Sequence, residues 1–260
     1  MGSIYVTVIV LLVVLFGIWE ASYRWGNWRR LHRGEQGVAD LSAIQAGILG
    51  LLALLLGFTY SYTVTHYEDR RRVVITEANA VGTAFLRADL LREPARSELR
   101  ALLREYAASR IIGGESLERD PAVLRAALNR VGVMHQSIWA ALMRGINEPP
   151  KPSDVLAIAS INDVIDLHTE RLARGTERLP WIIMWMLFFA AGAAVAITGY
   201  FMGAQQPRST IFARILIVLI VAVIFVILDL DRPRGGLIQV SQQPLIELMK
   251  SFNDGTGAQP

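Results

Sequence analysis

Four stretches of the chain are almost free of charged residues. Ile4 to Trp19, Leu41 to Tyr62 and Pro180 to Met202 contain no charge, and Ile211 to Leu228 contains only Arg214. A helix needs about 20 residues to cross the hydrocarbon core of a bilayer. The pattern therefore predicts four transmembrane helices, with Arg214 close enough to one end of the fourth to reach the interface.

Two other interpretations of these stretches are weaker. The first stretch is not typical of a signal peptide, because Met1 to Ile4 carries no positive charge and arginines, rather than a small-residue cleavage site, follow it. Buried core helices of a soluble protein are the second alternative. Four nearly charge-free stretches in one chain disfavour it.

The hydrophilic part of the chain lies between the second and third spans. From His66 to Arg92 it contains no proline, and the apolar positions Val74, Ala78, Val81 and Phe85 recur at three- and four-residue steps. This spacing places them on one face of a helix. We expect this helix to continue the second span out of the membrane as a single rod.

Further helices are expected along the rest of this part of the chain. Apolar spacing predicts one from Glu93 to Ile112, a second that starts at Pro121 and runs to Gly145, and a third, capped by Ser153, that runs to Ala173. No alternating strand pattern occurs. After the fourth span, only Pro244 to Phe252 has an amphipathic pattern.

The predicted fold class is an all-α membrane protein with a helical extramembrane domain inserted between the second and third of its four transmembrane helices. The expected organisation has four parts. They are the first two transmembrane helices with a short basic loop (1–62), the helical domain (63–178), the last two transmembrane helices (179–230) and a C-terminal tail (231–260).

Composition narrows the functions that the chain can have. Hydrophobic residues make up 53% and charged residues 19%, and the chain has no cysteine, which excludes disulfides and cysteine-ligated metal centres. A net charge of only +3 gives no reason to expect nucleic acid as a partner. No nucleophile-elbow, P-loop or dinucleotide-binding motif is present, so we expect neither an enzyme nor a cofactor.

Arginines around the first span predict the orientation of the chain. The N-terminal flank of this span is uncharged, whereas Arg24, Arg29, Arg30 and Arg33 follow it. Positively charged loops stay in the cytoplasm, and the first helix usually weighs most. With an even number of spans, both termini and the domain are then expected on the periplasmic side.

Several motifs resemble one family of membrane proteins. Leu55-Leu56-Gly57-Phe58 is followed by Glu68-Asp69-Arg70-Arg71 and by Glu77-Ala78-Asn79-Ala80-Val81-Gly82-Thr83, and the fourth span ends in Leu228-Asp229-Leu230-Asp231-Arg232-Pro233 with Gly235 behind. The chain from about Leu41 to Leu245 is similar to the bestrophin-like proteins of bacteria and plants. The resemblance implies a multi-pass protein of the bacterial inner membrane.

Bestrophins themselves are more distantly similar, and they are ring-shaped homopentameric ion channels with four spans per subunit. In them the second span lines the pore, and the phenylalanine of its Leu-Gly-Phe run belongs to a hydrophobic neck. The resemblance assigns that role to Phe58, and Leu54 and Leu51 lie one and two turns before it on the same face. No acidic cluster like the calcium clasp of animal bestrophins is present.

Polar residues near the second span are candidates for contact with ions. Thr59, Ser61 and Thr63 are candidate pore-lining residues, although close helix packing through small residues is the alternative for this span. The candidate charged mouth combines two sets. Arg70, Arg71 and Arg72 would favour anions, and Asp229 and Asp231 would favour cations unless they cap the end of the fourth span.

Four polar residues of the rod are expected to have structural roles, namely Glu77, Asn79, Arg87 and Asp89. Glu77 falls on the side of Val74 and Val81, and an ion pair with an arginine is its expected role. The domain also contains a possible metal patch, with Asn162, Asp166 and Glu170 at steps of four and Asp163 and His168 nearby. No complete ligand motif accompanies it, so a solvated polar face is favoured and no metal is expected.

Two functional hypotheses follow. The first is a homo-oligomeric ion channel, pentameric by analogy, whose partners are inorganic ions, the lipid bilayer and other copies of itself. The second is a non-conducting membrane-anchored scaffold or sensor whose helical domain binds a partner protein. The second span discriminates between them, because only a channel requires Phe58 to control conduction.

Overall fold

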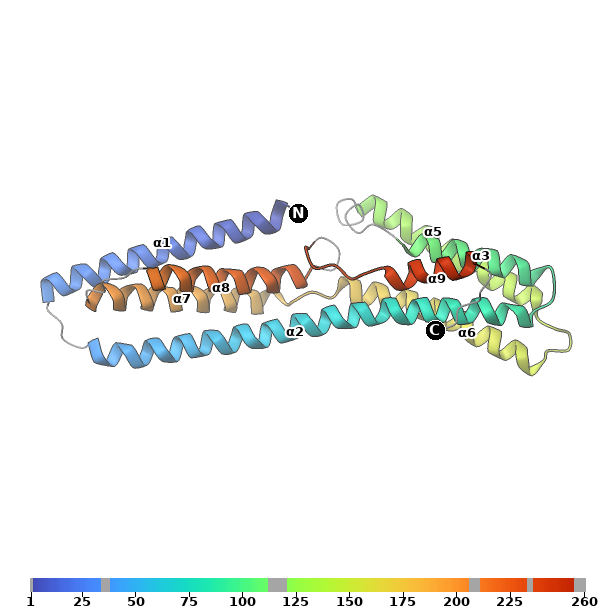
Figure 1. Cartoon of the computed structure of the whole chain (residues 1–260), viewed down its shortest axis with the longest axis horizontal. Helices are drawn as coiled ribbons and strands as arrows, with labels where there is room; N and C mark the ends of the chain where they lie inside the picture. Colours follow the sequence, from blue (N-terminus) through green and yellow to red (C-terminus); the bar gives the residue numbers. More distant parts are fainter. Residues whose placement is uncertain (1, 34–37, 112–120, 206–210, 233–235, 255–260) are drawn as a thin grey trace. The chain divides into compact units, whose positions relative to one another are not determined.

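The computed structural model describes residues 2–33, 38–111, 121–205, 211–232 and 236–254, and the regular secondary structure of these residues is helical. Figure 1 labels the α-helices of the protein, and its elements follow one another along the chain. They are α1 (Gly2–Arg33), α2 (Val38–Arg87), the 3-10 helix η1 (Ala88–Leu90), α3 (Ala95–Arg110), α5 (Pro121–Gly145), α6 (Pro152–Thr176), α7 (Trp181–Gln205), α8 (Ile211–Leu230) and α9 (Gln243–Asn253). The motif residues Pro233 and Gly235 lie outside the described residues.

The chain divides into two compact units. The membrane unit contains Met1–Thr65, Arg178–Arg232 and Gly236–Ile238, and the extramembrane unit contains His66–Glu177, Pro233–Gly235 and Gln239–Pro260. The expected single rod is confirmed, because α2 is one helix of 50 residues that begins in the first unit and ends in the second. The units meet between Thr65 and His66 within α2, and between Glu177 and Arg178 after α6.

Among the described residues, four helical stretches are long and apolar enough to cross a membrane. They are Ile4–His32, Ser42–Leu90, Pro152–Gln205 and Ile211–Leu230, each containing an apolar window of membrane-spanning length. This agrees with the four predicted spans. The protein is therefore an all-α membrane protein with four spans and a helical domain between the second and third.

The core of the membrane unit is formed mainly by α1, α7 and α8. Leu15 of α1, Leu187 of α7 and Ile224 of α8 are among its fully buried side chains. Three glycines let α1 and α7 approach closely. An added Cβ at Gly26 would meet the carbonyl oxygen of Tyr200, and one at Gly203 would meet that of Tyr23, while Gly199 lies one turn before Gly203. Small residues allow such backbone contact between membrane helices.

We expect Gly203→Ala to separate α1 from α7, because the added methyl group meets backbone atoms that cannot rotate away. Overpacking of this kind costs about 1–3 kcal/mol of folding free energy. Thermal unfolding of the purified protein in detergent measures the loss. Gly17→Ala is the control, since nothing lies within 4 Å of a Cβ added there. Equal melting temperatures for the two variants would contradict the assignment.

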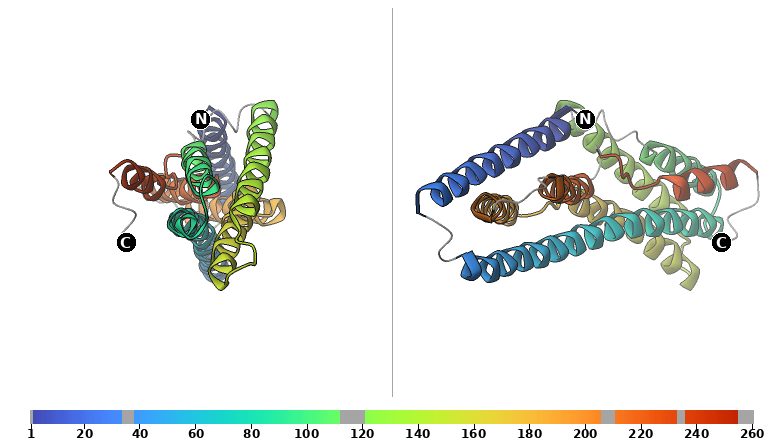
Figure 2. Two further views of the ribbon diagram at one scale, coloured as in Figure 1. Left: turned by 90° about the vertical axis from the view of Figure 1, so that its right-hand side faces the viewer. Right: turned by 60° about the vertical axis from the view of Figure 1, so that its left-hand side comes forward.

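The extramembrane unit packs the second half of α2 against α3, α5, α6 and α9. Phe85 of α2, Leu103 of α3, Ile138 of α5 and Ile161 of α6 are buried in its core. The helix α5 contacts both α3 and α6. In Figure 2 these three helices have the green to yellow colours of the middle of the chain.

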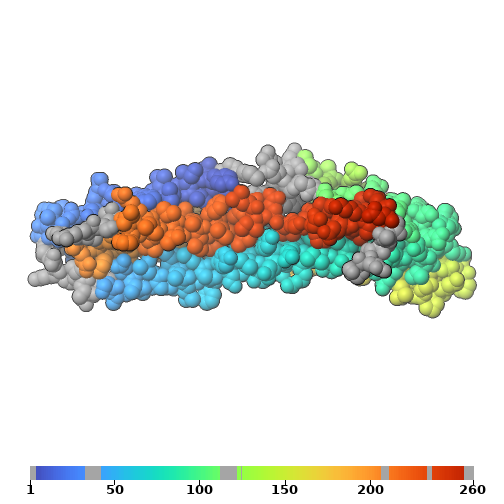
Figure 3. Space-filling view, in the orientation of Figure 1, coloured from blue at the N-terminus to red at the C-terminus, as the bar shows by residue number. Residues whose placement is uncertain are grey.

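The C-terminal segment is part of this core rather than a separate tail. The ring of Phe252 on α9 stacks on that of Phe85, with centroids 4.1 Å apart, and Leu245 and Leu248 are also buried. In Figure 3, α9 lies alongside the second half of α2. The amphipathic pattern of residues 244–252 therefore supplies one face of the domain core.

The start of α6 also differs from the expectation. The helix begins at Pro152, and the carboxylate of Asp154, rather than Ser153, accepts the Lys151 backbone N–H at 2.8 Å. Asp154 also accepts the side-chain amide of Asn147 at 2.8 Å. A carboxylate satisfies more donors than a hydroxyl, which explains its place at this buried turn.

Candidate functional site

Much of the α2 surface is exposed within the membrane unit, and the exposed surface includes the face that carries Phe58. Phe58 is 67% exposed, Leu51 55% and Leu54 53%, whereas Leu52 on the other side of the helix is 2% exposed. The spacing of three and four residues puts the three exposed side chains in one row. An added Cβ at Gly47, Gly50 or Gly57 would meet nothing within 4 Å. The subunit itself therefore leaves this row uncovered.

The structure separates the three polar residues expected to line a pore. Ser61 is exposed, on the same side of α2 as Phe58. Thr59 is buried and donates its hydroxyl to the Leu55 carbonyl oxygen at 2.7 Å. Thr63 is 1% exposed and donates to the Tyr60 carbonyl oxygen at 2.9 Å. Within the subunit, Thr59 and Thr63 thus do not share the open face.

The three arginines of the expected mouth also point in different directions. Arg70 is buried within the extramembrane unit, and Arg71 and Arg72 are exposed. Arg72 follows Phe58 by fourteen residues, close to four helical turns, so both project from the same side of α2. Its Nη1 lies 3.5 Å from the carboxylate of Asp69.

The aspartates at the end of α8 bind backbone groups. Asp229 is 1% exposed and accepts the backbone N–H groups of Leu237 and Ile238, each at 2.8 Å. Asp231 accepts the backbone N–H of Leu179 at 2.7 Å. The sequence allowed two roles for these aspartates, a helix cap or an ion vestibule. This geometry favours the cap, because the carboxylates already accept backbone N–H groups.

Glu77 is the centre of a buried polar cluster in the extramembrane unit. Its side chain is 0% exposed, and its carboxylate accepts Arg110 Nε at 2.7 Å and the Tyr106 hydroxyl at 3.0 Å. Its second oxygen pairs with Arg171. Arg171 in turn donates to Gln242 Oε1 at 2.8 Å. The ion pair expected for Glu77 is present, and three helices, α2, α3 and α6, meet at this carboxylate.

The cluster sets the protonation of its members. Burial alone would raise the pKa of Glu77, but the positive charges of Arg171 and Arg110 and their hydrogen bonds hold that pKa below its ordinary value. Burial, and the neighbouring Glu77 carboxylate, raise the pKa of the Tyr106 phenol. Glu77 is therefore ionised and Tyr106 neutral at physiological pH.

Two histidines adjoin this cluster. The rings of His135 on α5 and His168 on α6 meet edge to face with centroids 4.9 Å apart, and Tyr106 lies 5.4 Å from His135. Burial, the charge of Arg110 and the neighbouring His135 lower the pKa of His168 to about 4. Burial and Arg110 also lower the pKa of His135.

We expect the extramembrane unit to lose stability as the pH falls from about 6.5 to about 4. In this window the unfolded chain protonates His168, whereas the folded chain excludes the proton because the imidazole is buried and the charge of Arg110 lies nearby. The unfolded state then binds more protons than the folded state. The free energy of unfolding therefore decreases as the pH is lowered, by about 2–3 kcal/mol in total. Thermal unfolding across this range measures it. His168→Gln should flatten the profile, and an unchanged slope in that variant would contradict the assignment.

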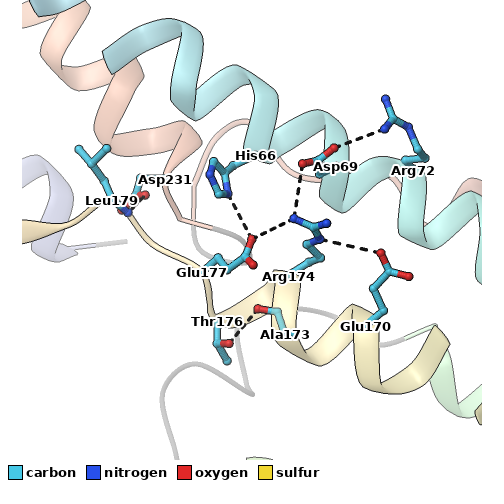
Figure 4. A network of polar contacts seen from close by, with 10 residues as sticks. All are labelled: His66, Asp69, Arg72, Glu170, Ala173, Arg174, Thr176, Glu177, Leu179 and Asp231. Atoms are coloured by element: carbon cyan, nitrogen blue, oxygen red, sulfur yellow. Dashed lines mark hydrogen bonds and ion pairs between the residues drawn. The ribbon is translucent and has the colours of Figure 1, made fainter. Parts of the chain in front are cut away.

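A second polar network occupies the beginning of the extramembrane unit and is drawn in Figure 4. Arg174 of α6 lies 3.6 Å from Asp69, 3.4 Å from Glu177 and 3.9 Å from Glu170. His66 lies 3.3 Å from Glu177. These pairs hold the first turns of the extramembrane part of α2 to the end of α6.

The remaining polar residues expected on the rod lie at its surface. Asn79 and Asp89 are exposed. Asp89 pairs with Arg100, whose guanidinium stacks over the Phe85 ring at 4.2 Å. Arg87 donates to the Leu156 carbonyl oxygen at 3.1 Å, which ties α2 to α6.

The residues of the possible metal patch lie on opposite sides of α6. Asn162, Asp166 and Glu170 are exposed on α6, whereas His168 is buried on its other side. Within the described ranges, no group of three or more histidine, cysteine or acidic side chains is arranged to hold a metal ion. Asn162, Asp166 and Glu170 thus belong to the exposed face of α6, and His168 belongs to its buried face.

Comparison with known proteins identifies the family. The model of the Bestrophin-like domain matches residues 9–245. The chain belongs to the Bestrophin-like family. No curated protein matches it.

Two solved structures share this bestrophin-like fold. A crystal structure of a bacterial Bestrophin homolog from Klebsiella pneumoniae with a tryptophan-to-alanine mutation superposes with a TM-score of 0.71 at 14% identity, covering 99% of this chain and 100% of that one. A second structure of a Bestrophin homolog from the same organism gives 0.64 at 16% identity, covering 98% and 100%. At these identities the likeness concerns the fold.

Proposed function

We propose that the chain is one subunit of a homo-oligomeric ion channel, pentameric by analogy with bestrophins, in which α2 surrounds the axis. The observation that carries this proposal is the open row of Leu51, Leu54 and Phe58 on α2. In a ring of subunits these side chains would meet at the axis. A narrow apolar ring of this kind gates by dewetting.

The polar residues after Phe58 support the same arrangement. Ser61 and Thr65 follow Phe58 on its side of α2, and Thr76, Asn79 and Thr83 recur there at three- and four-residue steps. All five are exposed in the subunit. A path that is apolar at its neck and lined by hydroxyl and amide groups beyond it would let hydrated ions approach the neck. Its partners would then be inorganic ions rather than an organic substrate, and no enzymatic activity is proposed.

The oligomer is tested first by mass. Size-exclusion chromatography with light scattering of the detergent-solubilised protein should give five times the 28.8-kDa subunit mass. A monomer in several mild detergents would contradict the proposal, because a single subunit cannot enclose a neck.

Arg72 is the charged residue that we place in the ion path. Arg72→Glu is expected to move the reversal potential of channel currents in a salt gradient toward the cation potential. The change in permeability ratio should be several-fold, since a unit charge a few ångströms from an ion is worth about 1 kcal/mol even in water. Arg71→Glu is the matched control, because Arg71 is exposed about a third of a turn away. Equal shifts in both variants would contradict the placement of Arg72.

We further propose that the subunit lies in the bacterial inner membrane with both termini and the extramembrane unit in the periplasm. The four arginines after the first span support this orientation. An alkaline phosphatase fused to the C-terminus should be active, and one fused in the loop after the first span should be inactive. The opposite pattern would reverse the orientation.

A further inference from the structure

Two histidines of the extramembrane unit have buried ring nitrogens without hydrogen-bond partners. His168 of α6 is 8% exposed, and its Nδ1 and the Nε2 of His135 on α5 are buried and unpartnered among the described residues. The two rings meet edge to face, with centroids 4.9 Å apart. Buried polar atoms are normally hydrogen-bonded, and each exception calls for an explanation. The proposed ion path does not use either ring.

The charges around the two rings oppose their protonation. Arg110 of α3 and Arg171 of α6 bring two positive charges to this part of the core, and Glu77 of α2 brings one negative charge. Both carboxylate oxygens of Glu77 are already paired, one with each arginine. Tyr106 of α3, whose ring adjoins the pair, is neutral at physiological pH. A proton on either imidazole would therefore add positive charge where it is already in excess, and burying that charge unpaired is costly.

The contact between α5 and α6 is where this charge would act. Each of the two helices carries one of the rings, and α6 packs against α5 and η1. Phe85, Leu103 and Phe252 join α2, α3 and α9 through apolar contacts that do not depend on pH. Repulsion at the two rings would therefore be relieved by separating α6 from α5, while the rest of the unit stays folded.

We propose that His135 and His168 form an acid-sensitive latch that holds α6 against α5 at neutral pH and releases it in acid. The neutral rings pack together in the core. The protonated rings repel each other and the nearby guanidinium groups, and after release they gain water as a hydrogen-bond partner. Burial and the charge of Arg110 lower the pKa of both imidazoles, that of His168 to about 4. The latch is therefore closed at neutral pH and opens only in clearly acidic surroundings.

The latch adjoins the helix that carries the proposed neck. Arg171 follows His168 by about one turn of α6 and pairs with Glu77, and Glu77 stands on the same continuous helix as Phe58. Release of α6 from α5 would thus disturb the link between α6 and α2. An effect of acid on ion flux rests on the proposed function, whereas the latch itself does not.

The distance between α5 and α6 tests the latch without any current measurement. The chain has no cysteine, so Gln136→Cys and Thr169→Cys, at exposed positions next to the two histidines, introduce the only thiols for spin labels. Mixing labelled subunits with excess unlabelled wild-type subunits suppresses distances between subunits. Double electron–electron resonance should show the mean distance rising by about 5 Å between about pH 7.5 and pH 4, since salt at 0.1 M screens charges about 10 Å apart. The change should reverse on neutralisation.

Three variants, made in the doubly labelled subunit, identify the group that responds. His168→Gln removes the titrating ring and should keep the neutral-pH distance in acid. His135→Gln should reduce the increase, and it provides a second test of the pair should His168→Gln not fold. His66→Gln is the matched control, because His66 belongs to the same unit but lies beside Glu177. It should respond as the wild-type protein does.

Circular dichroism and size exclusion in acid distinguish release of the latch from unfolding. A distance that stays constant between the two pH values would overturn the latch. An equal increase in His168→Gln, or an increase accompanied by loss of helical signal, would also overturn it, because acid would then act on the unit generally. A reversible increase that requires His168, in a protein that carries no current at either pH, would support the latch and contradict the channel.

Discussion

Glu77→Gln is expected to prevent the extramembrane unit from folding stably. The carboxylate of Glu77 is the anion that pairs with both Arg110 and Arg171, and it is fully buried. Its replacement leaves guanidinium groups in a low-dielectric core without that negative charge. Breaking a buried ion pair in this way costs about 3–5 kcal/mol, a large fraction of the stability of a typical domain.

The measurement is thermal unfolding, followed by fluorescence-detected size exclusion of the detergent-solubilised variant. Asn79→Ala is the control, because Asn79 is exposed on the same helix two residues later. A second variant separates charge from packing. Glu77→Leu combined with Arg110→Met and Arg171→Met removes all three charges and should recover part of the lost stability. A wild-type melting temperature for Glu77→Gln would refute the structural role of the cluster.

Phe58→Ala is expected to produce the largest change in ion flux. In the proposed ring, Phe58 forms the apolar neck, and a smaller side chain widens it and lets water enter. Lowering the barrier by about 1.4 kcal/mol would raise the flux about tenfold. Ion efflux from liposomes that contain equal amounts of the wild-type or variant oligomer measures the change.

Tyr60→Ala is the matched control for Phe58→Ala. Tyr60 is also a large exposed aromatic residue of α2, but it projects from the opposite side of the helix. Its truncation should leave the flux unchanged. If both variants conduct alike, Phe58 does not form the neck.

The helices of this protein could be predicted from the sequence because their patterns are local. Long charge-free stretches gave the four spans, and the proline-free amphipathic segment after His66 predicted the single α2 rod. Pro121 and Gly145 are also the observed ends of α5. The amphipathic run after Pro244 was visible in the sequence, but its place against Phe85 depends on a contact across more than 160 residues.

The polar clusters were harder to predict, since their members come from different helices. An arginine partner for Glu77 could be expected from its apolar neighbours on α2, but the sequence contains many arginines and does not single out Arg110 and Arg171. Spacing gave one usable signal, because Tyr106 and Arg110 stand four apart on α3 and His168 and Arg171 three apart on α6. Each pair lies on one face of its helix, and Tyr106, Arg110 and His168 are buried there.

The row of candidate pore residues illustrates the same limit. The spacing of Leu51, Leu54 and Phe58 predicted that they share a face, and this face is exposed in the subunit. Thr59 and Thr63 are buried, which depends on tertiary packing that the local sequence does not record, and their hydroxyls donate to carbonyl oxygens of their own helix. Hydroxyl groups in a span therefore indicate polarity without indicating a pore.

Currents across a planar bilayer that contains the purified wild-type oligomer test the central claim most directly. With a salt gradient across the bilayer, a channel gives discrete openings and a reversal potential that reports the sign of its ions. We predict such openings, with anions favoured because Arg72 lies on the Phe58 side of α2. An electrically silent bilayer, with an intact oligomer incorporated, would contradict the channel and favour a membrane-anchored scaffold or sensor.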